Sequence, residues 1–307
     1  MIDYLRESTF AVNDVIHKAW TITRKHYLSI ATLCFLMFIT SMASTIMSGL
    51  LREVDFFLSL FMLLVFVLLY FTLNLTLFRY VFHLLDDEKD DVLIVQTIPT
   101  KVQIVTFLIA SVVFVFTLLI IMLLTAFLPF ALFYILLKIR LFSVDQKVFS
   151  SISNVFLLIG FLSAFIAFVR LSFFPFFIID RKTDRLTFQE ISFSKTTGNF
   201  FRRITSTVSA LFTHALLSIK FSLALTKGNF TKLLLLLAVL ATFGYLYGYL
   251  RDNDVLIPGK IYLIILTLSF ISFIIVPLTA VSLTVAYRKM MDEYEGEANP
   301  TILHNLV

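Results

Sequence analysis

The stretch QIVTFLIASVVFVFTLLIIMLLTAFL, residues 103–128, decides the fold class of this chain. It contains no charged residue, and it exceeds the roughly 20 apolar residues that a helix needs to cross a bilayer. The whole chain is similar in character, with 59% hydrophobic and 15% charged residues, against about 45–50% and 25% in an ordinary soluble domain. Because helices satisfy their own backbone hydrogen bonds in lipid, the sequence predicts an all-α, polytopic integral membrane protein.

Apolar runs of this kind recur along the chain and predict about six transmembrane helices. We place them at 27–51, 56–78, 103–128, 152–179, 231–250 and 260–286. Apolar residues continue past Pro129 to Phe142. A single straight helix over 103–142 would be about 60 Å long, roughly twice the hydrocarbon thickness. We therefore expect a kink or break at Pro129.

Amphipathic segments flank and interrupt these spans. Residues 1–26 lack the features of a signal peptide, and they predict a cytoplasmic helix in the membrane interface, with Trp20 at headgroup depth. The insertion 180–230 predicts amphipathic helices in the plane of the cytoplasmic surface, and 287–307 predicts a polar, frayed tail. A seventh span over 206–225 is the open alternative, disfavoured by its His, Lys, Ser and Thr side chains.

Six spans place both termini on one side of the membrane, and the distribution of Lys and Arg indicates which side. With the termini inside, the predicted cytoplasmic segments carry about three times as many Lys and Arg residues as the outer loops, as the positive-inside rule requires. We therefore predict that both termini are cytoplasmic. The abundance of Phe, Ile, Lys and Asn suggests a bacterial source, and hence the bacterial inner membrane.

Two similar stretches, FSKTTGNFF (193–201) and FSLALTKGNF (221–230), predict joints between helices. A Gly at the end of a helix can adopt the left-handed conformation, and an Asn after it can cap the next helix. The residues to which we assign these two roles are Gly198, Asn199, Gly228 and Asn229.

Two longer stretches, FVRLSFFPFFIIDRKTD (168–184) and HALLSIKFSLALTKGNFTKLLLLLAVL (214–240), carry a family resemblance. They resemble the membrane-domain family found fused to bacterial glycerophosphodiester phosphodiesterases, and the related YciC-like proteins. The matching residues are Arg170, Asp180, Ala215, Ser222, Leu225, Thr226, Lys227, Gly228 and Asn229. The family's enzymatic activity resides in a separate catalytic barrel, which we do not expect here. The resemblance thus implies a fold without phosphodiesterase chemistry, and 185–213 stands out as an insertion.

Five basic residues are candidates for binding lipid phosphates or other anions. A charge inside a span is costly and often functional, and Lys and Arg at a cytoplasmic surface are attracted to anionic headgroups. The candidates are Arg170, in the fourth predicted span, and Arg202, Arg203, Lys220 and Lys227 in the insertion. For Arg170 a structural alternative stays open, in which its guanidinium binds backbone carbonyls or Asn74.

Other polar residues receive structural interpretations. We expect Asn74 to hydrogen-bond between helices, and we interpret Asp180 and Ser222 as structural too. The acidic run DDEKDD (86–91) fits no calcium-loop template and is interpreted as a helix terminator. The histidines lack metal-ligand spacing, and the single cysteine, Cys34, excludes an internal disulfide. We expect no metal and no cofactor.

The sequence contains no Gly-x-Ser-x-Gly, no HExxH and no paired intramembrane Asp. We therefore hypothesise a non-enzymatic membrane protein, either an accessory or scaffold subunit or a lipid-interacting factor. Its partners would be membrane lipids and other membrane proteins, and not nucleic acid. The alternative is a transporter or permease for a small or lipidic solute, with Arg170 receiving an anion. An enzyme acting on lipid headgroups would have only Asp180, Asp184 and Glu190 to use.

Overall fold

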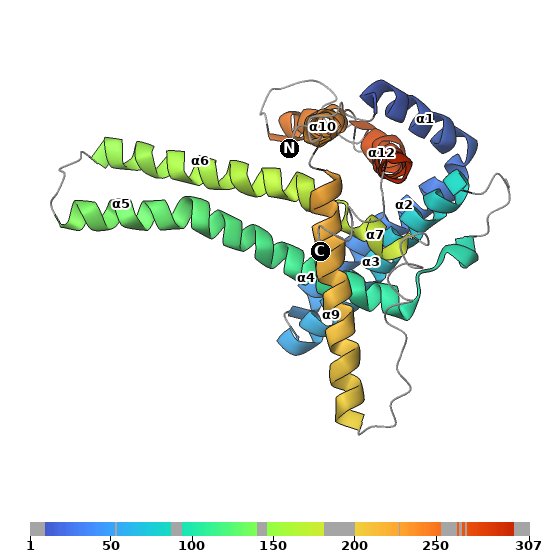
Figure 1. Cartoon of the computed structure of the whole chain (residues 1–307), viewed down its shortest axis with the longest axis horizontal. Coiled ribbons are helices and arrows are strands. Elements are labelled where there is room, and N and C mark those ends of the chain that lie inside the picture. The colour runs from blue at the N-terminus through green and yellow to red at the C-terminus, as the bar shows by residue number, and fades with distance from the viewer. Residues whose placement is uncertain are drawn as a thin grey trace. The chain divides into compact units, whose positions relative to one another are not determined.

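A computed structural model of the chain describes residues 10–52, 54–86, 94–139, 146–180, 200–226, 228–252, 263, 266–267 and 269–297. Every regular element in these residues is helical (Figure 1), which confirms the all-α class. Five helical runs are long and apolar enough to cross a membrane, or six if α9 (Phe200–Leu225) and α10 (Phe230–Asp252) form one broken span. The five runs are Tyr27–Arg52, Phe56–Asp86, Lys101–Lys138, Val148–Ile179 and Ile271–Met291.

The chain divides into two compact units, each assembled from separated segments. The first unit contains residues 1–104, 179–186 and 231–307, and the second contains 105–178 and 187–230. The helices of the first unit are α1 (Val12–Lys25), α2 (Tyr27–Arg52), α3 (Phe56–Asp86), the 3-10 turn η2 (Ile94–Thr97), α10, the π turn η4 (Ile271–Ile275) and α12 (Val276–Glu297).

A hairpin of α2 and α3 begins the membrane part of the first unit. In the turn between them, the Leu51 carbonyl accepts hydrogen bonds from the Val54 and Asp55 amides. The Asp55 carboxylate accepts from the Phe57 amide at 2.8 Å and so satisfies one free donor at the start of α3. These contacts end α2 and start α3 close to the predicted positions, and α3 continues beyond the predicted span to Asp86, the first residue of the acidic run.

The predicted N-terminal amphipathic helix is present as α1, and it packs against α12. Its buried side is formed by Val15, Ala19 and Thr23, which recur every four residues and so lie on one helix face. On α12, Tyr287 and Met290 are almost fully buried. Helix α12 therefore continues to Glu297, and the prediction that the frayed tail starts at 287 is wrong.

The second unit contains most of α4 (Lys101–Met122), the π turn η3 (Leu123–Phe127), α5 (Leu128–Lys138), α6 (Gln146–Leu171), α7 (Phe174–Ile179) and α9. A capping box opens α4: the Thr100 amide donates to Gln103 Oε1 at 3.0 Å, and the Gln103 amide donates to Thr100 Oγ1 at 3.3 Å. We call α4, η3, α5 and α6 together the α4–α6 hairpin.

Pro129 does not interrupt the helical run from Lys101 to Lys138. Instead, the π turn η3 precedes it, with the Leu128 amide donating to the Leu123 carbonyl, and α5 then begins with Pro129 in its first turn. Of the kink or break expected at Pro129, the structure shows no break, but it shows a local irregularity, the π turn η3. Proline is tolerated there because the first turn of a helix needs no amide donor.

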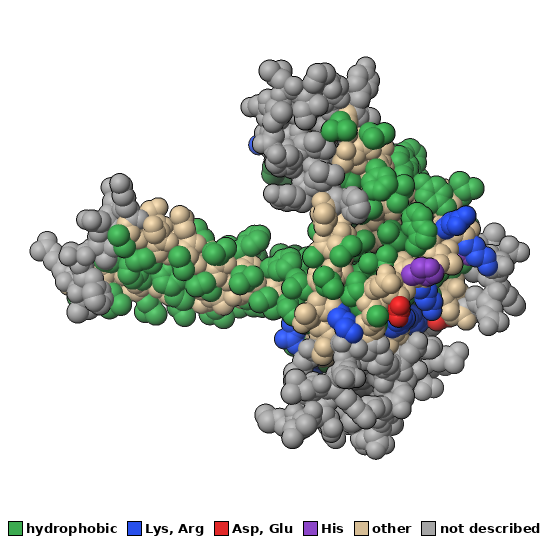
Figure 2. Space-filling view, turned by 90° about the horizontal axis from the view of Figure 1, so that it is seen from above, with side chains coloured by type: hydrophobic (Ala, Val, Ile, Leu, Met, Phe, Trp, Pro, Cys, Tyr) green, Lys and Arg blue, Asp and Glu red, His purple; other side chains and the backbone are tan. Residues whose placement is uncertain are grey.

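The two arms of the α4–α6 hairpin approach closely at Gly160. A Cβ atom added to Gly160 would lie 2.4 Å from the Cβ of Ala126, which belongs to η3. Farther out, four phenylalanines of the two arms pack face to face and edge to face: Phe130, Phe133, Phe149 and Phe156. Hydrophobic side chains cover the outer surface of α5 and α6 (Figure 2).

Helix α9 packs against α6 through a face of small and polar side chains. The buried residues of this face include His214, Ala215, Ser218 and Ser222, whereas Phe212 and Leu223 are exposed. Small residues let two helices approach closely, which is typical of packing inside membranes.

After α9, Gly228 lies in a turn with its φ outside the left-handed region, so its predicted left-handed role is wrong. Asn229 directly precedes α10, at the position expected for a cap. The first predicted joint, Gly198 and Asn199, lies outside the described residues, as does the predicted helix before it.

Candidate functional site

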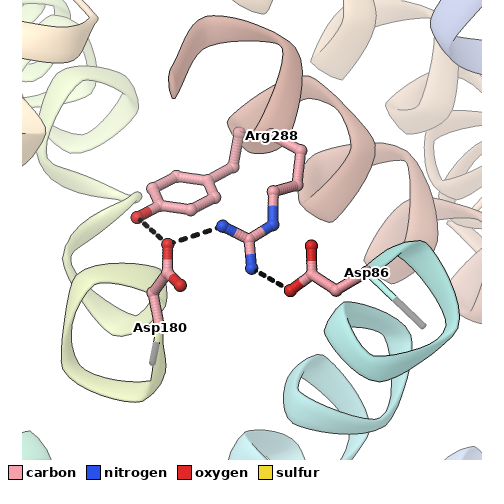
Figure 3. A network of polar contacts seen from close by, with 4 residues as sticks. Asp86, Asp180 and Arg288 are labelled. Atoms are coloured by element: carbon pink, nitrogen blue, oxygen red, sulfur yellow. Dashed lines mark hydrogen bonds and ion pairs between the residues drawn. The ribbon is translucent and has the colours of Figure 1, made fainter. Parts of the chain in front are cut away.

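Four polar residues meet in the interior of the first unit (Figure 3). The Arg288 guanidinium donates from Nη1 to Asp180 Oδ2 at 2.8 Å and from Nη2 to Asp86 Oδ2 at 2.5 Å. The Tyr287 hydroxyl donates to the same oxygen of Asp180 at 3.0 Å. We call Asp86, Asp180, Tyr287 and Arg288 the Arg288 network.

Burial decides how much these contacts matter. The Asp180 side chain is fully buried and the Arg288 side chain is 8% exposed, whereas the Asp86 side chain is 39% exposed. An ion removed from water without a partner costs several kcal/mol, so a buried carboxylate needs both a cation and hydrogen-bond donors. Asp180 obtains the cation from Arg288 and a further donor from Tyr287. Water can solvate the partly exposed Asp86 carboxylate. The two charges that are most buried, those of Asp180 and Arg288, therefore neutralise each other.

Aromatic side chains hold the Arg288 guanidinium in place. Its central carbon lies 4.4 Å from the centroid of the Phe82 ring, a distance at which a cation is attracted to the ring face. The Phe82 ring in turn meets the Tyr287 ring edge to face, with centroids 5.5 Å apart. Within the first unit, the network therefore joins the end of α3 and the middle of α12 to Asp180 through both polar and aromatic contacts.

Sequence reasoning found only part of this network. It named Asp180 as structural, interpreted Asp86 as part of a helix terminator, and gave Tyr287 and Arg288 no role. A signal was available, because the second, fourth and sixth predicted spans all end on the same side. Asp86 and Asp180 follow two of these ends and Arg288 follows the third, so this predicted topology would bring opposite charges to a similar depth.

A second polar cluster lies in the second unit, where α6 stops and α7 begins. Pro175 has no amide hydrogen to donate, and its ring crowds the carbonyl four residues earlier, that of Leu171. Accordingly α6 ends at Leu171 and α7 starts at Phe174. The fourth predicted span, 152–179, is thus interrupted, and the interruption leaves the Arg170 carbonyl and the Phe173 amide without helical partners.

Two hydroxyl groups of α9 satisfy these backbone groups. The Ser222 hydroxyl donates to the Arg170 carbonyl at 2.9 Å and accepts from the Phe173 amide at 3.1 Å. Thr226 Oγ1 also lies 3.0 Å from the Arg170 carbonyl. Ser222 and Thr226 are one helical turn apart, so both hydroxyls reach the same break. Polar side chains on a neighbouring helix commonly satisfy broken helices in membranes in this way.

The Arg170 side chain lies at the same break. Its Nη2 donates to the Leu223 carbonyl at 3.3 Å, close to the C-terminal end of α9, where the helix dipole favours a cation. Its buried Nε has no hydrogen-bond partner. This geometry corresponds to the carbonyl-bound alternative of the sequence analysis, and binding of an anion by Arg170 stays a prediction.

Among the other predicted residues whose side chains are described, Asn74 and Lys220 join neither cluster. Asn74 is half-buried on α3 and forms no hydrogen bond within the described residues, so nothing there supports its predicted helix–helix contact. Lys220 is exposed on α9. Arg202 and Arg203 belong to α9, but their side chains lie outside the described part of the chain, as does Lys227.

A third feature is the outward surface of α1. Lys18, Trp20 and Arg24 are exposed on this helix, opposite the buried side that packs on α12. The last turn of α1 holds Arg24 and Lys25, where basic side chains complement the negative end of the helix dipole. We call Lys18, Trp20 and Arg24 the outer face of α1.

Within the described residues, no group of three or more His, Cys, Asp or Glu side chains is placed to hold a metal ion. Comparisons of the chain with protein-family models, with curated proteins and with solved structures found no match. The resemblance to the phosphodiesterase membrane-domain family and the YciC-like proteins therefore stays a prediction.

Proposed function

We propose that this chain is a non-enzymatic, multi-pass protein of the bacterial inner membrane, which serves as an accessory or scaffold subunit and interacts with membrane lipids. The observation that carries the proposal is the outer face of α1. Lys18, Trp20 and Arg24 are exposed on a helix whose opposite side is fixed to α12. Basic amphipathic helices of this kind lie in the headgroup region, where Trp is also enriched.

The proposed orientation, with both termini in the cytoplasm, agrees with this role. It would place α1 against the cytoplasmic leaflet, whose anionic lipids attract nearby Lys and Arg with about 1 kcal/mol per residue. The basic candidates of the insertion, Arg202, Arg203, Lys220 and Lys227, would face the same leaflet. The resemblance to the phosphodiesterase membrane-domain family supports a membrane role of this type without supplying an enzymatic activity.

Two further observations support the scaffold form of the proposal. In each of the two long helical runs, Lys101–Lys138 and Val148–Ile179, only 11% of the most apolar 18-residue stretch is buried within the protein. This leaves a large apolar surface for lipid or for a membrane partner. The charges of the Arg288 network, by contrast, bind one another and link α3, Asp180 and α12 within the first unit.

Purification from native membranes tests the proposal directly. The protein is extracted in mild detergent, and co-purifying proteins and lipids are identified by mass spectrometry. We expect a membrane protein partner in a fixed ratio to the chain, and enrichment of anionic lipids relative to the bulk membrane. A protein that purifies alone would contradict the subunit form, and bound lipid of bulk composition would contradict the lipid-interacting form.

A transporter or permease is the second candidate, favoured by the break between α6 and α7. Interrupted helices with an arginine nearby are typical of substrate sites in transporters. However, Ser222 and Thr226 already satisfy the backbone groups that the break releases, and Arg170 binds the Leu223 carbonyl. If this candidate is correct, Arg170→Ala should abolish flux of an anionic solute in proteoliposomes while the protein still folds.

A further inference from the structure

Two adjoining hollows lie on the first unit, where α1 turns into α2. The first has a volume of about 300 Å³ and is lined by Trp20, Thr23, Arg24, Tyr27 and Ile274. The second has a volume of about 540 Å³ and is lined by His17, Trp20, Thr21, Arg24 and Lys25. The two hollows share Trp20 and Arg24, which are one helical turn apart and so form the wall between them.

Thr23 lines the first hollow, and its buried hydroxyl is an unused hydrogen-bond donor. It is only 2% exposed, and its hydroxyl has no hydrogen-bond partner. This is unusual for a helical threonine, because Thr21, Thr32 and Thr40 each donate to the carbonyl four residues earlier. A buried hydroxyl without an acceptor costs about 1–3 kcal/mol, so a ligand oxygen that accepts a hydrogen bond from Thr23 would recover this cost.

Arg24 is the cation best placed to bring such an oxygen to Thr23. It lines both hollows, and its guanidinium has no ion pair or hydrogen bond with a described residue. A guanidinium matches the geometry of a phosphate group and can donate two parallel hydrogen bonds to it. The shared position of Arg24 therefore suits a phosphate group that spans the two hollows.

The second hollow is more polar than the first, so the two together match a ligand with one polar and one apolar end. The second is lined mainly by the polar residues of α1, whereas the first reaches Ile274, inside a candidate membrane span. Trp20 and Tyr27 lie between these ends, 46% and 39% exposed. Both residue types prefer the boundary between headgroups and acyl chains. A free inorganic anion would make no use of the apolar end.

We propose that the two hollows together bind one anionic glycerophospholipid. Arg24 and Thr23 hold its phosphodiester, the hollow beside His17 and Lys25 receives the headgroup, and an acyl chain leaves along Ile274. The site rests on the lipid interaction proposed above and makes it specific, because it assigns that interaction to defined residues and to an anionic phospholipid.

The single tryptophan of the chain, Trp20, is a built-in reporter for this site. The full-length protein in a neutral detergent is titrated with dioleoylphosphatidylglycerol or with dioleoylphosphatidylcholine, and Trp20 emission is recorded. We expect a saturable change with phosphatidylglycerol and binding at least about tenfold weaker with phosphatidylcholine. Arg24→Gln should weaken phosphatidylglycerol binding by about tenfold or more, because it removes the charge-assisted hydrogen bonds to phosphate.

Two further variants separate this site from general surface attraction. Lys101→Gln removes an exposed positive charge at the start of α4, outside both hollows and outside the outer face of α1, so the affinity should stay within about twofold. Thr23→Val keeps the shape of the side chain and removes only the unused hydroxyl, so it should weaken binding without lowering thermal stability.

The outcomes distinguish this site from the broader proposal. Equal weakening by Lys101→Gln and Arg24→Gln would overturn the site and leave a general electrostatic interaction with lipid. Equal binding of the two lipids by the unmodified protein would overturn the lipid-interacting function as well. If inorganic phosphate competes at the same concentration as the lipid, the ligand is a free anion, and the lipid assignment is wrong.

Discussion

At Arg288 one cation lies between two carboxylates, and the three groups differ in their access to water. Asp180 depends on Arg288 because it is fully buried, whereas Asp86 is partly exposed. Buried ion pairs often add little net stability compared with apolar residues, but loss of one partner leaves a buried charge without compensation. Removal of Arg288 alone should therefore lower the free energy of unfolding more than removal of the charges of both Arg288 and Asp180.

A double-mutant cycle measures this dependence. Arg288→Met, which keeps the side-chain stem, should lower the free energy of unfolding by about 3–5 kcal/mol, because Asp180 keeps its charge in the interior. Adding Asp180→Asn should recover at least about 1 kcal/mol, because the uncompensated charge is then gone. Unfolding in dodecyl sulfate, followed by Trp20 emission, reports both values, since α1 packs on α12 in the same unit.

Lys289→Met is the matched control for this cycle. Lys289 is adjacent in sequence and only partly buried, and it forms no ion pair with a described residue. Its replacement should change the free energy of unfolding by no more than about 0.5 kcal/mol. Additive effects of Arg288→Met and Asp180→Asn would show that the two side chains are not coupled.

Sequence reasoning at this scale succeeded where a residue acts through local chemistry. Ser222 was named as a structural polar residue, and it does bind backbone groups at the helix break. The joint roles of Asp86, Asp180 and Arg288 could not be derived from local pattern, because they depend on contacts between residues far apart in the chain. The unused Thr23 hydroxyl also has no sequence signal, since its neighbour Thr21 donates to the backbone as usual.

At the scale of helices, three prolines inside apolar runs are accommodated in the same way. Pro129, Pro175 and Pro277 each occupy the second residue of a new helix, where no amide donor is needed. A π turn precedes Pro129 and another precedes Pro277, whereas two turn residues precede Pro175. The sequence predicts a kink or break at Pro129, but not its form. At Pro175, hydroxyls from α9 satisfy the released groups, and α9 is distant in sequence.

The π turn η3 has a packing consequence at Gly160. Because a Cβ there would lie 2.4 Å from the Ala126 Cβ, Gly160→Ala should destabilise the α4–α6 hairpin by about 1–3 kcal/mol. Moving the methyl group, with Gly160→Ala and Ala126→Gly together, should restore most of that loss. The thermal midpoint of the detergent-solubilised protein, measured by size-exclusion chromatography after heating, provides the readout.

Gly49→Ala serves as the control for the Gly160 experiment. Gly49 also lies within a long apolar helix, α2, but a Cβ there would meet no atom within 4 Å. The substitution should be neutral or stabilising by about 0.5–1 kcal/mol, since glycine is a poorer helix former than alanine. A loss of stability at Gly49 equal to that at Gly160 would rule out the close approach as the cause.

At the scale of the whole molecule, hydropathy predicted the helices better than their assembly. Five of the six predicted spans overlap helical runs that are long and apolar enough to cross a membrane, because a segment's own composition decides this property. The predicted span 231–250 meets these criteria only together with α9. The division into two units was not predicted, since each unit combines segments that are far apart in the chain. The extension of α12 to Glu297 was missed for the same reason, as Tyr287, Arg288 and Met290 are buried by tertiary contacts.

The proposed orientation makes a prediction for the whole chain that also decides whether 206–225 spans the membrane. Cys34 is the one cysteine and is buried, so Cys34→Ala gives a suitable background for single-cysteine labelling. With six spans, a membrane-impermeant maleimide added to intact cells should label Ser143→Cys, in the predicted outer loop after the third span. It should label Lys18→Cys, or a cysteine added after Val307, only once the membrane is permeabilised. If 206–225 also spans, the added C-terminal cysteine will be labelled in intact cells while Lys18→Cys stays protected. Labelling of Lys18→Cys from outside would reverse the orientation, and would place the outer face of α1 against the opposite leaflet.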